Sequence, residues 1–173
     1  RSAQSRADAA EAIAAHVGGA AFAQVPTVAA YLSMGHEPGT GPLLDLLHAR
    51  GADVLVPVAA ADGALGWVRH RPDVRLTRSA LGVPEPDGER LGPEALSHAD
   101  LVVVPALAVD HTGWRLGRGA GYFDRALAHA RAPICAIVFA EELLAEVPHD
   151  DHDVPVQLVV TESGIFRVFA ASA

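Results

Sequence analysis

A segment rich in glycine and arginine carries the strongest chemical signal in this sequence. Residues 113–125 read Gly-Trp-Arg-Leu-Gly-Arg-Gly-Ala-Gly-Tyr-Phe-Asp-Arg and follow an apolar run at 101–104. Gly117, Gly119 and Gly121 stand at alternate positions, where successive backbone N–H groups can converge and no Cβ blocks a ligand. The segment then opens a predicted helix, whose N-terminus adds a partial positive charge. This pattern predicts an anion site, although such a turn can also serve only to pack the helix.

Three arginines within the same segment strengthen that prediction. Arg115, Arg118 and Arg125 lie within eleven residues of a chain whose net charge is −8. Each guanidinium group can fork two donors onto phosphate oxygens. The cluster therefore favours a polyphosphate ligand, while the simpler alternative is that these arginines are solvated.

Two acidic positions are candidates for a magnesium site beside the phosphates. Asp124 falls in the first turn of the predicted helix, where an acid is also favoured by the helix dipole alone, by about 0.3–1 kcal/mol. Asp153 belongs to the hydrophilic run 149–153, which needs no function as a turn. Mg²⁺ commonly takes one or two carboxylates together with phosphate oxygens. A zinc site is disfavoured, because no cysteine or closely spaced helical histidine pair accompanies the run.

Glu37 and three aromatic residues complete the candidate set. Glu37 lies in a loop that follows a predicted strand. Tyr122 directly follows the glycines and can offer its ring to a flat heterocycle, whereas Trp67 and Phe123 are equally compatible with the core.

Apolar runs alternating with amphipathic segments predict the elements that position these residues. We expect helices at 5–17, 42–50, 121–129 and 141–145, strands at 25–32, 54–58, 64–70, 101–104, 134–139, 158–161 and 165–169, and a long surface excursion at 71–98. Strands that are apolar throughout and alternate with helices indicate an α/β fold of three layers, with a mainly parallel sheet covered by helices on both faces. Residues 1–173 are expected to form a single domain. Ligands of such sheets bind beyond the carboxyl ends of the strands, here after Leu32, Val58, Val104 and Phe139.

Composition excludes several classes of function. All 13 basic residues are arginine, which excludes a Walker-type phosphate loop and a Schiff-base lysine within these residues. The acidic balance argues against nucleic-acid and anionic-membrane partners. Cys135 is the single cysteine and lies in an apolar run, so we expect a buried thiol and no intrachain disulfide. The apolar stretch 12–32 is interrupted by polar residues and Pro26, and a cytoplasmic protein is expected.

The segment 115–125 closely resembles the signature of the 5-formyltetrahydrofolate cyclo-ligase family, also called 5,10-methenyltetrahydrofolate synthetases. The resemblance continues over essentially the whole chain, in Tyr31–Glu37 with Thr40, Gly82–Pro86, Val104-Pro105 with Asp110, Val147-Pro148, Asp153 and Thr161-Glu162. It implies a Rossmann-like fold similar to the NagB/RpiA/CoA-transferase-like group.

The resemblance also implies an activity and its cofactors. The family closes 5-formyltetrahydrofolate to 5,10-methenyltetrahydrofolate with ATP and Mg²⁺, and releases ADP and phosphate. The formyl oxygen is thought to attack the γ-phosphate, which gives an imino phosphate that N10 displaces. A monomer acting on the small folate substrate and ATP is expected.

Residue roles follow from the same resemblance. The nucleotide would contact Arg115, Gly117, Arg118, Gly119, Ala120, Gly121, Tyr122 and Phe123. The folate would contact Glu37, Trp67, Arg118, Gly119, Gly121 and Tyr122, with Arg118 and Tyr122 acting in catalysis. Asp124 and Asp153 would hold Mg²⁺.

The chain departs from the family pattern at a few positions. Ala120 replaces Lys or Gly, Phe123 replaces a second Tyr, and Leu81 stands where an aromatic residue is frequent. The family's N-terminal Lys and Arg, which reach ATP, precede the segment that Arg1 matches. These departures keep open a non-catalytic paralogue that binds folate or nucleotide. A dinucleotide-dependent Rossmann enzyme fits less well, because the acid expected about twenty residues after the glycines is not clearly placed at the end of the next predicted strand.

Overall fold

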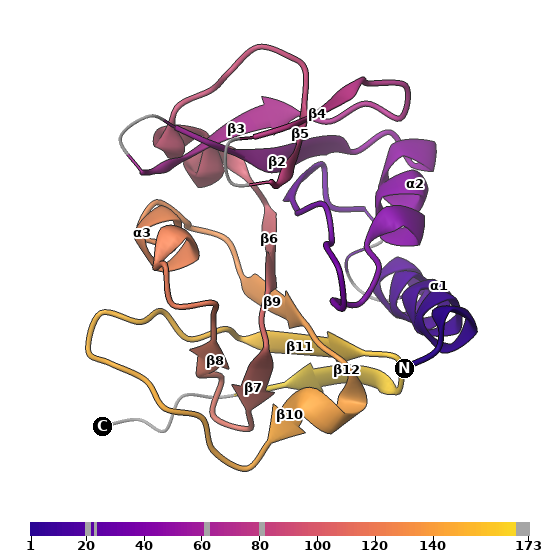
Figure 1. The fold of residues 1–173 in the computed structure, drawn as a ribbon, viewed down its shortest axis with the longest axis vertical. Helices are drawn as coiled ribbons and strands as arrows, with labels where there is room; N and C mark the ends of the chain where they lie inside the picture. Colours follow the sequence, from indigo (N-terminus) through magenta and orange to yellow (C-terminus); the bar gives the residue numbers. More distant parts are fainter. Residues whose placement is uncertain (20–21, 23, 61–62, 80–81, 169–173) are drawn as a thin grey trace.

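A central sheet of seven strands organises the computed structural model, which describes residues 1–19, 22, 24–60, 63–79 and 82–168. The strand order is β12-β11-β9-β6-β1-β2-β3 (Figure 1). The five inner strands run parallel, and β3 and β12 add antiparallel edges. The strands are β1 Thr27–Ala29, β2 Asp53–Ala59, β3 Leu65–Arg69, β6 Leu101–Pro105, β9 Ile134–Ile137, β11 Leu158–Thr161 and β12 Gly164–Arg167. The expected mainly parallel α/β fold is therefore confirmed.

The inner strands are apolar throughout because both faces of the sheet are buried. On β6, Leu101 and Val103 pack toward one core, and Val102 and Val104 pack toward the other. The same alternation holds along β2, β9 and β11. Successive side chains of a strand point to opposite faces of the sheet, so a strand that is buried on both faces needs apolar residues at successive positions.

The two faces are covered differently. Helices α1 (Ala3–Gly19) and α2 (Gly41–Ala49) cover one face, on the right of Figure 1. The other face is covered by the short helix α3 (Tyr122–Leu127), the 3-10 helix η1 (Pro93–His98) and β7 (Ala108–Asp110). Strand β7 pairs with β8 (Arg115–Leu116) and β10 (Leu143–Leu144) in a second, three-stranded sheet. Helices therefore reach both faces as expected, but a small sheet shares one of them.

Several local expectations are corrected by the structure. The expected helix 141–145 is a 3-10 turn, η2 (Ala140–Glu142), followed by β10, because Leu143 and Leu144 pair with β7. The helix expected at 121–129 ends at Leu127, where the backbone tightens into turns before Pro133. The surface excursion 71–98 contains a hairpin of β4 (Leu76–Arg78) and β5 (Pro84–Pro86) as well as η1. Leu81 and Phe169 lie outside the described residues.

A buried carboxylate holds the hairpin between β7 and β8. Asp110 is 2% exposed, and its Oδ1 accepts hydrogen bonds from the backbone N–H of Thr112 (2.9 Å) and Trp114 (3.1 Å) and from the Thr112 hydroxyl (2.6 Å). Its Oδ2 accepts from the N–H of Val147 at 3.2 Å. One side chain therefore shapes the turn that precedes Arg115 and ties it to the segment after β10.

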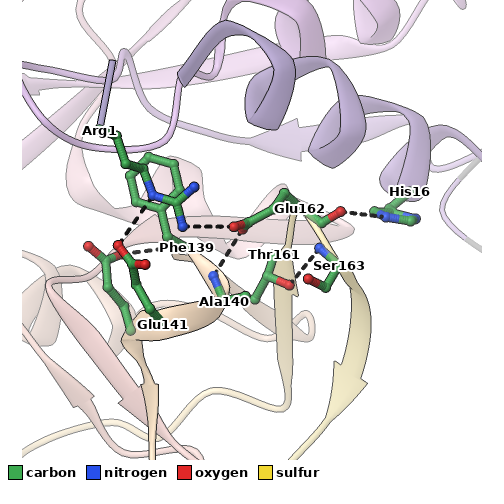
Figure 2. Close-up of polar contacts among 9 residues, drawn as sticks. Arg1, His16, Phe139, Ala140, Glu141, Thr161, Glu162 and Ser163 are labelled. Carbon is green, nitrogen blue, oxygen red and sulfur yellow. Dashed lines mark hydrogen bonds and ion pairs between the residues drawn. The ribbon is translucent and has the colours of Figure 1, made fainter. Parts of the chain in front are cut away.

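Arg1 joins the start of α1 to the loops that follow β9 and β11, as Figure 2 shows. Its guanidinium lies over the Phe139 ring at 4.1 Å and pairs with Glu162 at 2.9 Å and Glu141 at 3.3 Å. The second oxygen of Glu162 accepts a hydrogen bond from the N–H of Ala140. Glu162, noted in the sequence as part of a motif, thus has a structural role at this junction.

Two further expectations concern apolar segments. In the described part of the chain, no helix has the length and apolarity needed to cross a membrane. Cys135 is buried on β9 as expected, and burial raises the pKa of its thiol to about 12.

Gly113 is predicted to be the glycine of the hairpin turn at which an added Cβ is destabilising. Its φ is +97°, and a Cβ there would overlap the carbonyl oxygen of Val156, whose N–H donates to Gly113 O. Gly51→Ala is the matched control, because Gly51 has φ +77° but open space around it. We expect Gly113→Ala to lower the free energy of unfolding by about 1–3 kcal/mol more than Gly51→Ala does, measured by urea denaturation. Equal losses would contradict the close approach.

Asp110 is predicted to make stability depend on pH. Burial raises the pKa of Asp110, but its hydrogen bonds from Thr112, Val147 and Trp114 outweigh burial and hold the pKa below the ordinary value. Because the pKa is depressed in the folded state, the stabilisation is present above the unfolded pKa near ~3.9 and is lost as the pH falls through the folded pKa. Asp110→Asn should cost about 1–3 kcal/mol at pH 7.

The measurement compares urea unfolding of both proteins at pH 7 and pH 3. The difference between wild type and Asp110→Asn should narrow at pH 3. A difference that stays constant across this range would show that the charge of Asp110 does not stabilise the hairpin.

Candidate active site

A cavity of about 630 Å³ opens at the carboxyl ends of the parallel strands. This volume lies within the ordinary range for small-molecule sites. Segments that follow β1, β2 and β6 line it, as the topology predicts, together with the segment after β10. Leu65 on β3 and residues 83–85 at β5 add to the lining. The lining includes Met34, Glu37, Val58, Ala59, Pro105–Leu107, Arg115–Asp124, Pro148–Asp150, His152 and Asp153.

The glycine-rich segment forms one wall of the cavity. Gly119 and Gly121 have φ angles of +83° and +65°, so the backbone is left-handed at these two positions, whereas Gly117 does not have a positive φ. Gly121 is also the N-cap of α3. Because α3 has only six residues, its dipole is weak, and the helix contributes less to anion binding than expected. Positive charge in this wall comes instead from arginine.

Arg118 extends from this wall toward the loop after β1. Its side chain is 57% exposed, and its Nη2 donates to Glu37 Oε1 at 2.9 Å. Glu37 is nearly buried, and its other oxygen accepts from the N–H of Met34 at 2.8 Å. The ion pair therefore joins a carboxylate held in place by the loop to a guanidinium that faces the cavity and solvent.

Arg115 is the buried counterpart of Arg118. Its side chain is 3% exposed and forms an ion pair with Asp124 Oδ1, while its Nε is buried with no hydrogen-bond partner among the described residues. Burial lowers the pKa of the Arg115 guanidinium, and the charges of Asp124 and Asp153 oppose this shift. A buried donor without a partner beside the cavity is suited to an incoming anionic oxygen.

The three-arginine cluster expected from the sequence is therefore reduced to two. Arg125 donates to the carbonyl oxygens of Gly63 and Ala120, and its guanidinium lies 5.2 Å from the centre of the Tyr122 ring. The guanidinium of Arg125 is therefore bound to backbone carbonyl oxygens and lies near the Tyr122 ring. It supports the glycine-rich wall instead of lining the cavity.

Asp124 and Asp153 both line the cavity, on opposite segments. Asp153 Oδ2 accepts from the N–H of Asp150 at 2.8 Å, and Asp124 pairs with Arg115. Over the described residues, no group of three or more His, Cys, Asp or Glu side chains is arranged to hold a metal ion. Two carboxylates suit Mg²⁺ that arrives with phosphate oxygens, and do not suit a metal held by the protein alone.

The aromatic candidates separate into two environments. Tyr122 and Phe123 line the cavity. Trp67 is 1% exposed in the core, pairs with Leu91, and is not one of the described residues that line the cavity. Leu65, two residues earlier on the same strand, lines it instead. Trp67 is expected at the folate, but the structure buries it in the core cluster that also contains Leu65.

Glu85, which belongs to the expected surface excursion and to the motif Gly82–Pro86, also lines the cavity. It is 5% exposed, its Oε1 accepts from the N–H of Ala59 at 2.6 Å, and its Oε2 pairs with Arg90 at 3.2 Å. In the sequence, the signal for Glu85 is the motif Gly82–Pro86. In the structure, Glu85 lies on β5. His149, the first residue of the hydrophilic run 149–153, lines the opposite wall.

Comparison with known proteins agrees with this geometry. Residues 1–162 match the model of the 5-formyltetrahydrofolate cyclo-ligase family. A protein of Mycolicibacterium smegmatis with that name is 46% identical over 142 residues, which cover 78% of this chain and 73% of the relative. Its Escherichia coli counterpart is 31% identical over 146 residues, covering 82% and 80%.

Solved structures lead to the same family. The 5,10-methenyltetrahydrofolate synthetase of Aquifex aeolicus superposes with a TM-score of 0.83 at 27% identity, over 100% of this chain and 88% of that one. A synthetase from Mycoplasma pneumoniae shares the fold with a TM-score of 0.73 at 16% identity, over 94% and 90% of the two chains. The resemblance found in the sequence is confirmed, and this protein belongs to the 5-formyltetrahydrofolate cyclo-ligase family of enzymes.

Proposed function

We propose that this protein closes 5-formyltetrahydrofolate to 5,10-methenyltetrahydrofolate with consumption of ATP and release of ADP and phosphate. The observation that carries the proposal is the pairing of Arg118 with Glu37 across the cavity. A cation suited to phosphate and a carboxylate suited to the N–H groups of a pterin face each other, as joining two ligands requires.

The reaction is proposed to run in two steps. The formyl oxygen attacks the γ-phosphorus of ATP, a P–O bond forms, and ADP leaves with the electrons of the broken bond. N10 then attacks the formyl carbon, loses its proton, and inorganic phosphate departs as the ring closes. Both steps need alignment and charge neutralisation more than a protein nucleophile. Cys135 is no alternative nucleophile, because burial raises the pKa of its thiol to about 12.

Each wall of the cavity has a proposed task. The segment Arg115–Phe123 binds the phosphates through backbone N–H groups and arginine, and Arg118 stabilises charge as it shifts toward the leaving oxygen. Arg118, Gly119, Gly121 and Tyr122 also border the folate, and Glu37 hydrogen-bonds it. Trp67 supports the folate wall from the core. The described lining residues all belong to one chain, and a monomer is proposed.

Asp124 and Asp153 are the residues proposed to hold Mg²⁺. The ion would supply neutralisation of phosphate charge when it is bound. Asp124 is held by Arg115, so its carboxylate is oriented before any ligand arrives. Asp153 is oriented by the N–H of Asp150 in the same way.

The direct test is the rise in near-ultraviolet absorbance of the methenyl product. Full-length protein is mixed with 5-formyltetrahydrofolate, ATP and Mg²⁺, and each component is omitted in turn. A rise that needs all three supports the proposal. Binding of folate and nucleotide without product would contradict it and would favour a non-catalytic paralogue.

Arg118→Ala is predicted to lower kcat/KM by about tenfold or more, because transition-state charge on the phosphoryl oxygens loses a donor. Arg131→Ala is the matched control, since Arg131 is exposed beyond α3 and away from the cavity lining. Steady-state rates at saturating Mg²⁺ measure the effect. A rate for Arg118→Ala equal to that of Arg131→Ala would remove Arg118 from the reaction.

Asp124→Asn is predicted to raise the Mg²⁺ concentration needed for half-maximal rate by several-fold, because a neutral amide binds the ion more weakly than a carboxylate does. It should also lower stability, because the buried charge of Arg115 loses its counter-ion. Asp153→Asn provides a comparison without that loss of an ion pair. Magnesium titrations and urea unfolding separate the two effects, and unchanged activity of both variants at limiting Mg²⁺ would exclude the metal role.

A further inference from the structure

The cavity wall formed by residues 147–153 is attached to the β7–β8 hairpin at two points. The N–H of Val147 donates to Asp110 Oδ2 at 3.2 Å. The rings of His149 and Trp114 stack, with centroids 3.9 Å apart and an angle of 12° between their planes. Both hairpin residues precede Arg115, and Trp114 is its immediate neighbour. The two attachments therefore set the distance between this wall and Arg115.

Beyond His149, the wall is an internally bonded turn. Asp150 N–H donates to Asp153 Oδ2 at 2.8 Å, and Asp153 N–H donates to Asp150 O at 3.0 Å. Residues 148–152 are exposed, so burial of apolar surface contributes little to holding the turn in place. Its position relative to Arg115 then depends on the contacts at Val147 and His149, which precede it, and on the hydrogen bond from the N–H of Val156 to Gly113 O at 2.8 Å, which follows it.

Asp153 is the group at the end of this turn that faces the site. It lines the cavity together with Arg115, and its negative charge opposes the lowering of the pKa of the Arg115 guanidinium by burial. If the 150–153 turn shifted outward from the cavity, this carboxylate would move away from Arg115 and Asp124.

We infer that His149 is a positioning residue, whose stacking on Trp114 holds the 150–153 turn so that Asp153 faces Arg115 across the cavity. The inference rests on the proposed function for the task of Asp153, but the stack itself is a property of the protein without ligands. The near-parallel rings assign the role to the aromatic plane and not to proton transfer by the imidazole. His149→Phe should therefore preserve the stacking on Trp114, and His149→Ala should not.

The experiment compares His149→Ala, His149→Phe, Trp114→Leu and the double variant His149→Ala/Trp114→Leu in the full-length protein. His149→Ala and Trp114→Leu should each raise the Mg²⁺ concentration for half-maximal rate between about twofold and tenfold, the range that an aromatic pair supports. Turnover at saturating Mg²⁺ should change little, because the reacting groups remain. The double variant should be no worse than either single variant, since both remove the same contact.

His149→Phe provides the rescue, and its pH–rate profile should match that of wild type. His111→Ala is the matched control, because His111 is an exposed histidine in the same hairpin. A second readout needs neither magnesium nor turnover. Amide hydrogen exchange of residues 147–153 in the ligand-free protein should be faster in His149→Ala and Trp114→Leu, and close to wild type in His149→Phe and His111→Ala.

Three outcomes would overturn the inference. Exchange in His149→Ala equal to that of wild type would show that the stack does not hold the turn. Faster exchange without a change in the magnesium requirement would show that the position of the turn does not control the contribution of Asp153 to magnesium binding. If His149→Phe does not restore the wild-type magnesium requirement and its pH–rate profile is shifted, His149 acts through the chemistry of its imidazole and not through stacking. If wild type itself makes no methenyl product, the proposed function fails, while the exchange experiment still decides whether His149 holds the turn.

Discussion

The buried carboxylate of Asp110 is the contact on which the site most depends. It accepts hydrogen bonds from the hairpin turn at 112–114 and from Val147, so one side chain joins the strand before Arg115 to the segment that carries Asp153. Such a group is stabilising only while ionised and fully bonded, because a buried acceptor without donors would cost several kilocalories. The two walls of the cavity are far apart in sequence, and this shared carboxylate makes them one structural unit.

Two ion pairs in the cavity differ in burial, and the difference separates their tasks. Arg115 with Asp124 is largely removed from solvent, so breaking it would leave an uncompensated charge and the pair acts as a fixed part of the wall. Arg118 is more than half exposed, and its pair with Glu37 is correspondingly weak. An exposed pair can exchange partners when an anion arrives, whereas a buried pair cannot. Adaptable binding and fixed orientation therefore come from the same eleven-residue segment.

Sequence patterns predicted the sheet well and its covering less well. The strands at 54–58, 101–104, 134–139 and 158–161 are evident because a strand buried on both faces must be apolar at every position. Leu143 and Leu144 were expected in a helix and form a strand, since the pairing partner β7 lies more than 30 residues earlier in the chain. Local periodicity contains no information about such a partner. Trp67 shows the same limit, because an aromatic residue suits a ligand wall and a core equally until its neighbours are known.

What the sequence determined by itself is the chemistry available: a glycine-rich segment with arginines, acids on either side of it, and no lysine or accessible thiol. Those properties depend on residue type and on spacing within one loop. Only the tertiary structure decided which groups face one another. In it, Arg125 donates to backbone carbonyl oxygens, and Arg115 is buried against Asp124. Glu37 pairs with Arg118, and His149 stacks on Trp114. Apart from the Arg115–Asp124 pair, which lies within one segment, these contacts join segments that are distant in sequence, where packing and desolvation, and not local pattern, set the energy.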